Sequence, residues 1–242
     1  MILHDKTIRN NLSESECHEK MLSDEDIEMI WKLAFSGGKV RKNKLGNIFI
    51  TGDVVNQAYD IVRDKILVRG ELYGGNFFIT SHPYGLHLDS FNRVDVKDGH
   101  DNTTVYKNVL IPLWIGGSDI GDHLTFFEQR LIDYGSAFNY GGSTSYKESK
   151  YQVYDDYSSL QFVDRNGKDI DKKHNSSVFN RHDKDKYLQN IEHTRLTGMS
   201  IENAFEWKPR DIIIFDSVQI HASNRTQWSN KMGLLLKFGV EI

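Results

Sequence analysis

The 242-residue sequence predicts a mainly β fold, a sandwich or barrel with helices on its N-terminal side. From about position 76 onward, short runs of β-branched and aromatic residues alternate with glycine-containing turns. Two amphipathic helical patterns precede these runs. A chain of this length can bury one sizeable core, and all-β barrels of this size commonly form a single domain. We therefore expect one domain over residues 1–242.

Two helices are predicted in the first 75 residues, which we expect to form a mixed, largely helical scaffold. Ser23 is a suitable N-cap, because acidic residues and then apolar residues at helical spacing follow it, and this pattern ends near Gly37. A second helical pattern runs from Asp53 to about Lys65, with its apolar residues on one face. Both helices are expected to pack against a sheet.

The remaining chain, 76–240, carries the predicted strands. They are short apolar runs bounded by turn-forming residues, and they cover residues 77–80, 86–89, 105–114, 124–128, 211–215 and 232–240. The stretch from about 141 to 190 is polar and has few apolar residues to anchor it. We interpret it as an insertion in the β region, either a lid over a site or a solvated loop.

Composition and charge argue against several classes of protein. Hydrophobic residues make up 38% and charged residues 26%, which is typical of a globular protein. The formal net charge is -4, which argues against nucleic-acid binding through phosphate contacts. Cys17 is the only cysteine, so it can form no internal disulfide and no thiolate metal cage. No signal pattern opens the sequence and no apolar run has membrane-spanning length, so we expect a cytoplasmic protein without membrane contact.

His87-Leu88-Asp89 is a candidate metal-binding motif. Side chains alternate between the two faces of a strand, so His87 and Asp89 project from the same face and can bind one ion. With 10 histidines and 34 acidic residues in 242, about 1.4 His-x-acid matches are expected by chance (10 × 34/242), and the sequence has one. Alone, the motif therefore indicates only a polar strand end.

A histidine far downstream completes the motif. The apolar run that ends at Asp216 leads through a turn to His221, and Lys231 begins the next apolar strand. Two histidines and one carboxylate form a facial triad, which covers one face of an octahedral iron and leaves three positions open. A bidentate 2-oxoacid and dioxygen can fill these positions, whereas a structural metal site would be fully caged.

At these residues the chain resembles the 2-oxoglutarate/Fe(II)-dependent dioxygenases, nearest to the phytanoyl-CoA hydroxylase-like branch. The resemblance covers roughly residues 76–240. The matching segments are Tyr84 to Asp89, Val109 to Leu113, Lys208 to Asp216, and His221 with Lys231. The family fold is a double-stranded β-helix, a jelly-roll or cupin-like barrel with flanking helices. The resemblance implies this fold for the present chain.

The resemblance also implies roles for individual residues. His87, Asp89 and His221 would bind Fe(II), and Lys231 would bind the distal carboxylate of the cosubstrate 2-oxoglutarate. The family more often has arginine at the Lys231 position, and lysine lacks the planar fork of arginine, so Arg225 is a rival for this role. The remaining candidates are Thr125 for the 2-oxoglutarate pocket and Tyr84 and Arg130 for the substrate.

The strand that begins at Lys231 supports its assignment. By the period-two rule Lys231, Gly233, Leu235 and Lys237 share one face of this strand. A lysine and a glycine together near a barrel mouth leave both charge and room for a dicarboxylate. Arg225 is expected in the turn between two strands, where its direction is not fixed.

The implied activity is that of an oxidoreductase. It would hydroxylate a small-molecule or lipid-like substrate and would convert 2-oxoglutarate and dioxygen to succinate and carbon dioxide. The carboxylate of Asp89 favours hydroxylation or another hydrogen-abstraction outcome, since related halogenases lack it. Three alternatives stay open: a nucleic-acid or protein oxygenase of the same superfamily, a cupin-like binding protein without turnover, and a jelly-roll interaction domain without a metal.

Overall fold

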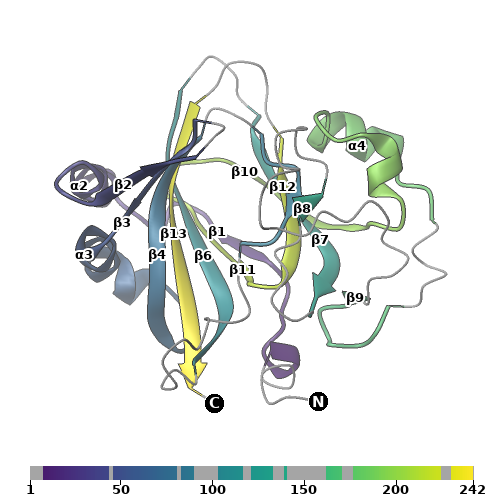
Figure 1. Ribbon diagram of the computed structural model, residues 1–242, viewed down its shortest axis with the longest axis horizontal. Helices are drawn as coiled ribbons and strands as arrows, with labels where there is room; N and C mark the ends of the chain where they lie inside the picture. Colours follow the sequence, from purple (N-terminus) through teal and green to yellow (C-terminus); the bar gives the residue numbers. More distant parts are fainter. Residues whose placement is uncertain are drawn as a thin grey trace.

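The computed structural model describes residues 8–43, 46–80, 83–89, 103–116, 121–132, 139–140, 162–170, 177–224 and 230–241. This part of the chain forms two antiparallel sheets that face each other, with helices on their outer sides (Figure 1). The helices are α2 (Asp24–Ala34), α3 (Asp53–Val62) and α4 (Arg181–Tyr187), with 3-10 turns at Arg63–Lys65 and His193–Leu196. The strands are β1 (Glu16–His18), β2 (Lys39–Lys42), β3 (Ile48–Thr51), β4 (Glu71–Thr80), β5 (Leu86–His87), β6 (Thr103–Gly116), β7 (His123–Leu131), β8 (Asn139–Tyr140), β9 (Phe162–Val163), β10 (Ile201–Glu206), β11 (Ile212–Asp216), β12 (Gln219–Ser223) and β13 (Asn230–Glu241).

The strand order defines the fold. The larger sheet has the order β1-β11-β6-β13-β4-β3-β2, and the smaller sheet has the order β10-β7-β12-β5-β8. From β4 to β7 and again from β10 to β13, consecutive strands belong to opposite sheets. This arrangement of eight strands in two facing sheets is a double-stranded β-helix, or jelly roll. The predicted fold class is therefore confirmed.

Three apolar layers hold these elements together. One layer lies between the two sheets and contains Leu110, Leu124, Phe126, Trp207, Ile213, Phe215 and Leu235. A second layer joins the outer face of the larger sheet to α2 and α3, where Phe77, Met232 and Leu234 pack against Val54 and Val55. A third layer covers the outer face of the smaller sheet. The residues of β13 alternate between the first two layers, as the pattern of that strand predicts.

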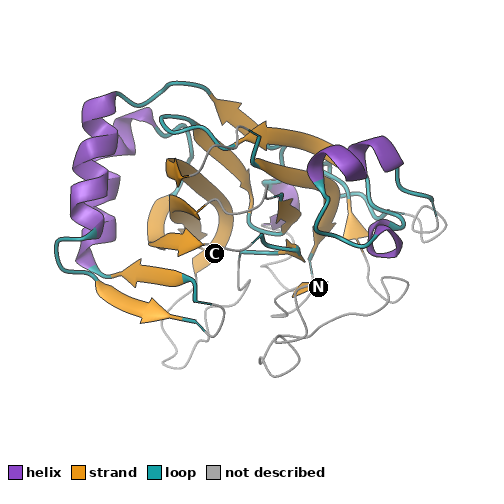
Figure 2. Ribbon diagram, turned by 90° about the horizontal axis from the view of Figure 1, so that it is seen from above, coloured by secondary structure: helices purple, strands orange, loops and turns teal. Residues whose placement is uncertain are grey.

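The two predicted helices are present, and both lie on the larger sheet at one side of the molecule, opposite α4 (Figure 2). The N-terminus of α2 is fixed by a capping box, in which the Ser23 side chain accepts from the Asp26 backbone N–H and the Asp26 carboxylate accepts from that of Ser23. The short strands β2 and β3, which were not predicted, extend the larger sheet on this side. No helix in the described part of the chain is both long and apolar enough to cross a lipid bilayer.

The expected insertion at 141–190 lies only partly within the described residues, at 162–170 and 177–190. This described part is anchored more firmly than its polarity predicted. Phe162, Phe179 and Leu188 are buried in the layer outside the smaller sheet, and β9 pairs with β7. A few widely spaced apolar residues thus suffice to hold the described part of this polar segment against a sheet face.

Candidate metal centre

Three side chains converge inside the barrel at the smaller sheet. β5 pairs with β12 so that His87 lies directly opposite His221, and their ring centroids are 4.2 Å apart. Asp89 follows β5, with Oδ1 at 3.6 Å from His87 Nε2 and Oδ2 at 3.2 Å from His221 Nε2. One ligand atom from each residue lies within 4.8 Å of the others, which is close enough for all three to bind one ion.

The backbone orients both histidine rings. His87 Nδ1 lies 2.8 Å from the carbonyl oxygen of Gly85, and His221 Nδ1 lies 3.0 Å from that of Gln219. A carbonyl oxygen only accepts, so each Nδ1 carries the proton and donates it. Each Nε2 therefore presents its lone pair toward Asp89, which is the tautomer and direction that metal ligation requires.

Burial sets the charge state of the cluster. His221 is 2% exposed, and its ring contacts Phe126 and Phe215 in the barrel interior. This burial, together with the neighbouring His87, lowers the pKa of His221 and favours the neutral ring. Burial raises the pKa of Asp89, but the positive charge that His221 and His87 would carry when protonated outweighs this effect, so that pKa lies well below its usual range and the carboxylate is ionised. A carboxylate and two neutral imidazoles are the forms that bind a metal.

The donor set selects a class of metal. Two imidazole nitrogens and one carboxylate from one side suit a divalent transition metal such as Fe(II), with coordination positions left open for other ligands. A closed structural site would need further protein ligands, and the described residues bring together only these three. The cluster thus has the composition of a catalytic metal site.

Lys231 lies in the barrel near one end of β13. It is 4% exposed and pairs with Thr80 on β4. Its Nζ lies 4.8 Å from the centroid of the Trp207 ring and 4.0 Å from Oδ2 of the buried Asp122. Asp122 therefore supplies a buried counter-charge near the ammonium group.

The space expected beside Lys231 is occupied. A Cβ added to Gly233 would lie 2.8 Å from Phe78 and 2.9 Å from Trp207, because these two rings fill the volume above the glycine. Gly233 therefore makes room for aromatic side chains, not for a dicarboxylate. The expectation that it opens the pocket was wrong, because the sequence did not show which residues pack over this strand.

Tyr84 borders the metal centre. Its ring centroid lies 5.2 Å from that of His87, and its hydroxyl accepts a hydrogen bond of 2.8 Å from Asn47 Nδ2. Asn47 Oδ1 in turn accepts from Thr80, the residue paired with Lys231. A polar chain of side chains thus runs from the His87 ring to the Lys231 position.

Arg225, the rival of Lys231, lies outside the described residues.

The structure does not bring Thr125 to the metal centre. Thr125 on β7 pairs with Ala222, and its neighbour Phe126 pairs with His221. Because paired residues share a face and adjacent residues do not, Thr125 points to the outer side of the smaller sheet. Its hydroxyl is buried there without a hydrogen-bond partner among the described residues.

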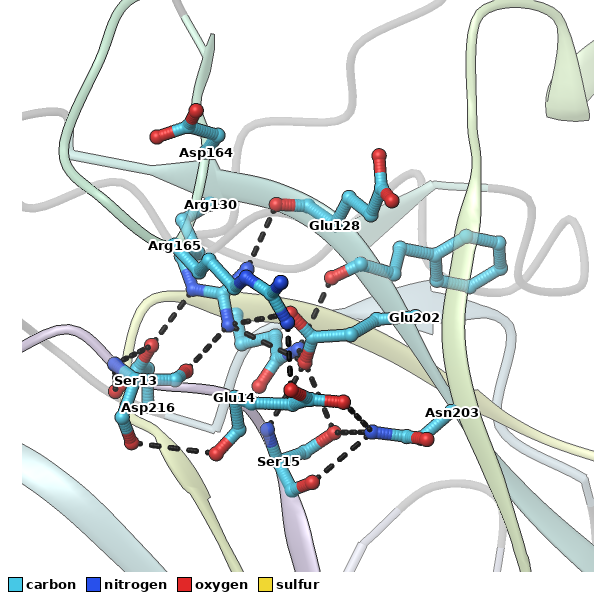
Figure 3. A network of polar contacts seen from close by, with 12 residues as sticks. Ser13, Glu14, Ser15, Glu128, Arg130, Asp164, Arg165, Glu202, Asn203 and Asp216 are labelled. Carbon is cyan, nitrogen blue, oxygen red and sulfur yellow. Dashed lines mark hydrogen bonds and ion pairs between the residues drawn. The ribbon is translucent and has the colours of Figure 1, made fainter.

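Arg130 does not face a substrate site. Its side chain is fully buried in a polar network at the end of the barrel (Figure 3). Nε donates to Asp216 over 2.6 Å, and Nη2 donates to Glu202 over 2.9 Å and to the Ser13 carbonyl over 2.6 Å. Nη1 donates to the carbonyl of Glu128. These contacts use all three guanidinium nitrogens as donors to protein acceptors. Arg130 therefore has a structural role in place of the expected contact with substrate.

Two residues near the centre were not among the predicted site residues. Lys237 Nζ donates to the backbone carbonyl of Asp89 over 2.5 Å, and Asn108 pairs directly with Lys237. The alternation of β13 placed Lys237 on the same face as Lys231. However, its proximity to Asp89 depends on closure of the barrel, and no local pattern predicts this.

The fold and the site together define a class: a double-stranded β-helix with a two-histidine, one-carboxylate cluster inside the barrel. No family model matches the sequence, and no curated protein matches it. Similar solved structures exist at low identity. A prolyl-4-hydroxylase from Pseudomonas putida is 10% identical, with 98% of each chain covered and a TM-score of 0.44.

Two further structures show the same level of likeness. HygX from Streptomyces hygroscopicus, solved with nickel, 2-oxoglutarate and hygromycin B bound, is 9% identical over 99% of this chain and 87% of that chain, with a TM-score of 0.46. The non-heme α-ketoglutarate-dependent epimerase SnoN from nogalamycin biosynthesis is 8% identical over 97% and 82%, with a TM-score of 0.46. At these identities the likeness concerns the fold alone, and the fold assignment rests on the strand order.

Proposed function

We propose that the protein is an Fe(II)- and 2-oxoglutarate-dependent oxygenase that hydroxylates a small-molecule substrate. The convergence of His87 Nε2, Asp89 and His221 Nε2 within 4.8 Å carries this proposal, because these three ligands leave part of a metal's coordination sphere open. The interior of a double-stranded β-helix holds them on paired strands. Similar structures solved with 2-oxoglutarate, such as that of HygX, are consistent with this chemistry.

Each residue of the centre has a defined task. The backbone carbonyls of Gly85 and Gln219 keep the two histidines in the ligating tautomer, and Asp89 supplies the negative charge. When bound, iron and 2-oxoglutarate supply an oxidative decarboxylation, which yields succinate and carbon dioxide and is coupled to hydroxylation. The apolar rings of Phe126 and Phe215 around His221 keep bulk water from this side of the centre.

Lys231 is proposed to bind the distal carboxylate of 2-oxoglutarate. Its ammonium group is buried between Asp122 and Trp207, and the polar chain through Thr80, Asn47 and Tyr84 connects this position with His87. A buried ammonium group is a suitable partner for an incoming carboxylate, because a charge-assisted hydrogen bond is stronger than a neutral one. The planar fork of an arginine is not needed for a single charge-assisted contact.

The substrate class and the branch of the superfamily are also proposed. A substrate among small molecules or lipid-like compounds is favoured over nucleic acid by the net charge of -4. A place in the phytanoyl-CoA hydroxylase-like branch depends on the sequence resemblance alone. A cupin-like protein that binds a metal without turnover is the second candidate, because the same three ligands could hold a metal without oxygen chemistry.

Succinate formation distinguishes the two candidates. The purified protein is incubated with Fe(II), 2-oxoglutarate and air, and succinate is measured without added substrate. We expect slow, iron-dependent formation that disappears in His87→Ala and His221→Ala. His123→Ala is a matched control, because this histidine lies on the outer side of the smaller sheet against Tyr187. Unchanged succinate formation in His221→Ala would overturn the proposal, and a metal-binding protein that forms no succinate would support the second candidate.

A further inference from the structure

A row of residues crosses the inner face of the larger sheet beside the metal centre. Lys237 on β13 pairs with Gly74 on β4 and with Asn108 on β6, and Asn108 pairs with Phe215 on β11. Directly paired residues of antiparallel strands project from the same face. Phe215 contacts the ring of His221 with 5.0 Å between centroids, so the whole row faces the barrel interior.

Lys237 supplies a cation next to the ligand segment. Its Nζ donates to the backbone carbonyl of Asp89, and the side chain is largely buried. An ammonium group has three N–H donors, and this contact uses one of them. The negative charge of the Asp89 carboxylate also acts on this ammonium group. Its positive charge is therefore directed into the space beside the metal centre.

Asn108 supplies an unpartnered amide. The residue is 0% exposed, and neither Nδ2 nor Oδ1 has a hydrogen-bond partner among the described residues. Buried polar groups in folded proteins nearly always have partners, because leaving them without one is costly. Here both a donor and an acceptor are left, on a side chain that lies between Lys237 and Phe215. This points to a bound group that both accepts and donates.

Gly74 leaves room for that group. A Cβ built at Gly74 meets no atom within 4 Å, although the neighbouring Gly75 would meet Leu235 O at 2.3 Å and Gly233 would meet Phe78 at 2.8 Å. Two other glycines of the same sheet are therefore filled, and the one opposite Lys237 is open. The backbone dihedral angles of Gly74 do not require glycine. The absence of a side chain at this position therefore provides open volume and is not needed for a special backbone conformation.

We infer that the row of Gly74, Lys237 and Asn108 binds the primary substrate through a carboxylate with a hydrogen-bond donor next to it, as in an α-hydroxy or α-amino acid. One carboxylate oxygen would accept from Lys237 Nζ and the other from Asn108 Nδ2. The adjacent hydroxyl or amine would donate to Asn108 Oδ1. The proposal rests on the proposed function and names the substrate class of the same site.

This row is separate from the position proposed for 2-oxoglutarate. Lys231 and Lys237 lie on the same face of β13, but they are six positions apart along the strand, a distance of about 20 Å along the backbone. Lys231 lies beside Trp207 and Asp122, and Lys237 lies beside Asp89. Each lysine can therefore bind its own carboxylate, one on each side of the metal centre.

Glycolate, the smallest α-hydroxy carboxylate, is a suitable probe. The protein is loaded with Fe(II) and saturating 2-oxoglutarate under nitrogen, and the visible absorption of the iron–2-oxoglutarate chelate is recorded to show that 2-oxoglutarate stays bound. The broadening of the glycolate proton signal by the paramagnetic iron then reports binding close to the metal. We expect saturable broadening with wild-type protein and much weaker broadening of the neutral analogue glycolamide.

Three variants test the row. Lys237→Met, Asn108→Leu and Gly74→Val should each weaken glycolate binding by about tenfold or more, as expected for the loss of a charge-assisted contact or of the open space. The side chain of Asn108 forms no hydrogen bond with Asp89 in the described part of the chain. The Asn108→Leu variant therefore tests substrate binding without the effect that a change at Lys237 has on the ligand segment. Lys208→Met, which changes an exposed lysine, should bind glycolate as the wild type does.

The outcomes are distinct. Glycolate binding that is unchanged in Asn108→Leu and Lys237→Met, or absent from a wild-type complex that retains its absorption, overturns this inference and leaves the proposed function intact. Absence of the chelate absorption in the wild type overturns the proposed function itself. Broadening that is strongly weakened in all three variants of the row and persists in Lys208→Met confirms the inference.

Discussion

At the scale of single residues, Lys231 gives the sharpest distinction between two rival assignments. We predict that Lys231→Met raises the apparent KM for 2-oxoglutarate by about one to two decades, because a buried charge-assisted contact contributes roughly 1.5–3 kcal/mol. The measurement is the rate of succinate formation as a function of 2-oxoglutarate concentration. Lys208→Met, which changes an exposed lysine, should leave KM unchanged. A larger rise in Arg225→Met than in Lys231→Met would reverse the two roles.

The charge state of His221 gives a second residue-scale prediction. Burial lowers the pKa of His221 below the ordinary value of 6.5, so in the metal-free protein the unfolded state binds more protons just below that value. The contribution of His221 to the free energy of unfolding is therefore fully present above pH 6.5 and is lost as the pH falls from there through the lowered pKa.

Urea unfolding of the metal-free protein tests this pH dependence. Between pH 7.5 and pH 5.5, wild type should lose more stability than His221→Gln, because glutamine cannot take up the proton. Chelator is present throughout, since bound metal would hold the histidine neutral. Parallel pH profiles of the two proteins would contradict the role of burial at His221.

Which residues come together was predictable from the sequence only where a motif fixed their order. His87, Asp89 and His221 are brought together as expected, because a His-x-Asp on a strand and a distant histidine have a recognisable order. Arg130 could not be placed, since its partners Asp216 and Glu202 lie 86 and 72 positions away in the sequence. Whether a charged residue faces a pocket or an internal ion pair depends on contacts of this kind.

At the scale of elements, the network around Arg130 joins four parts of the chain. Arg130 on β7 contacts Asp216 on β11, Glu202 on β10 and the N-terminal segment at Ser13 (Figure 3). Lys107 on β6 also forms an ion pair with Asp216. Both Arg130 and Asp216 are fully buried, so removal of one partner leaves an uncompensated charge in the interior.

We therefore predict that Arg130→Met lowers the free energy of unfolding by about 3–5 kcal/mol. Urea denaturation at neutral pH measures the change. Arg165→Met is the matched control, because Arg165 forms an exposed ion pair with Glu14 that contributes roughly 0–1 kcal/mol. Equal and small effects of the two substitutions would show that the buried network does not stabilise the fold.

The elements themselves were predictable to different degrees. α2 and α3 follow from helical periodicity and, for α2, from the cap at Ser23, which are local signals. β12 was not predicted as a strand, because Gln219 to Ser223 mixes polar and apolar residues although all of them are buried. Polar and apolar residues alternate in this run, but it has five residues and only two of them, Ile220 and Ala222, are apolar, so it gives a weak strand signal.

At the scale of the whole molecule, closure of the two sheets creates the site. His87 and His221 are far apart in the sequence and become direct neighbours because β5 and β12 pair. The same closure puts Lys237, on β13 of the larger sheet, beside Asp89 and buries Lys231 of the same strand against Trp207. The sequence predicted a jelly roll through its resemblance to a family, but the strand order and the filling of the interior are long-range properties that only the structure provides.

An anaerobic titration tests the central claim most directly. Under nitrogen, 2-oxoglutarate is added to the Fe(II)-loaded protein, and visible absorption is recorded, since a 2-oxoacid that chelates Fe(II) through its carboxylate and ketone gives a charge-transfer band. The proposed centre predicts a saturable band in the wild type that needs both Fe(II) and 2-oxoglutarate and that is lost in His221→Ala. A wild type that binds Fe(II) but develops no band, or a band that persists in His221→Ala, would contradict the assignment of His87, Asp89 and His221 as an open iron site.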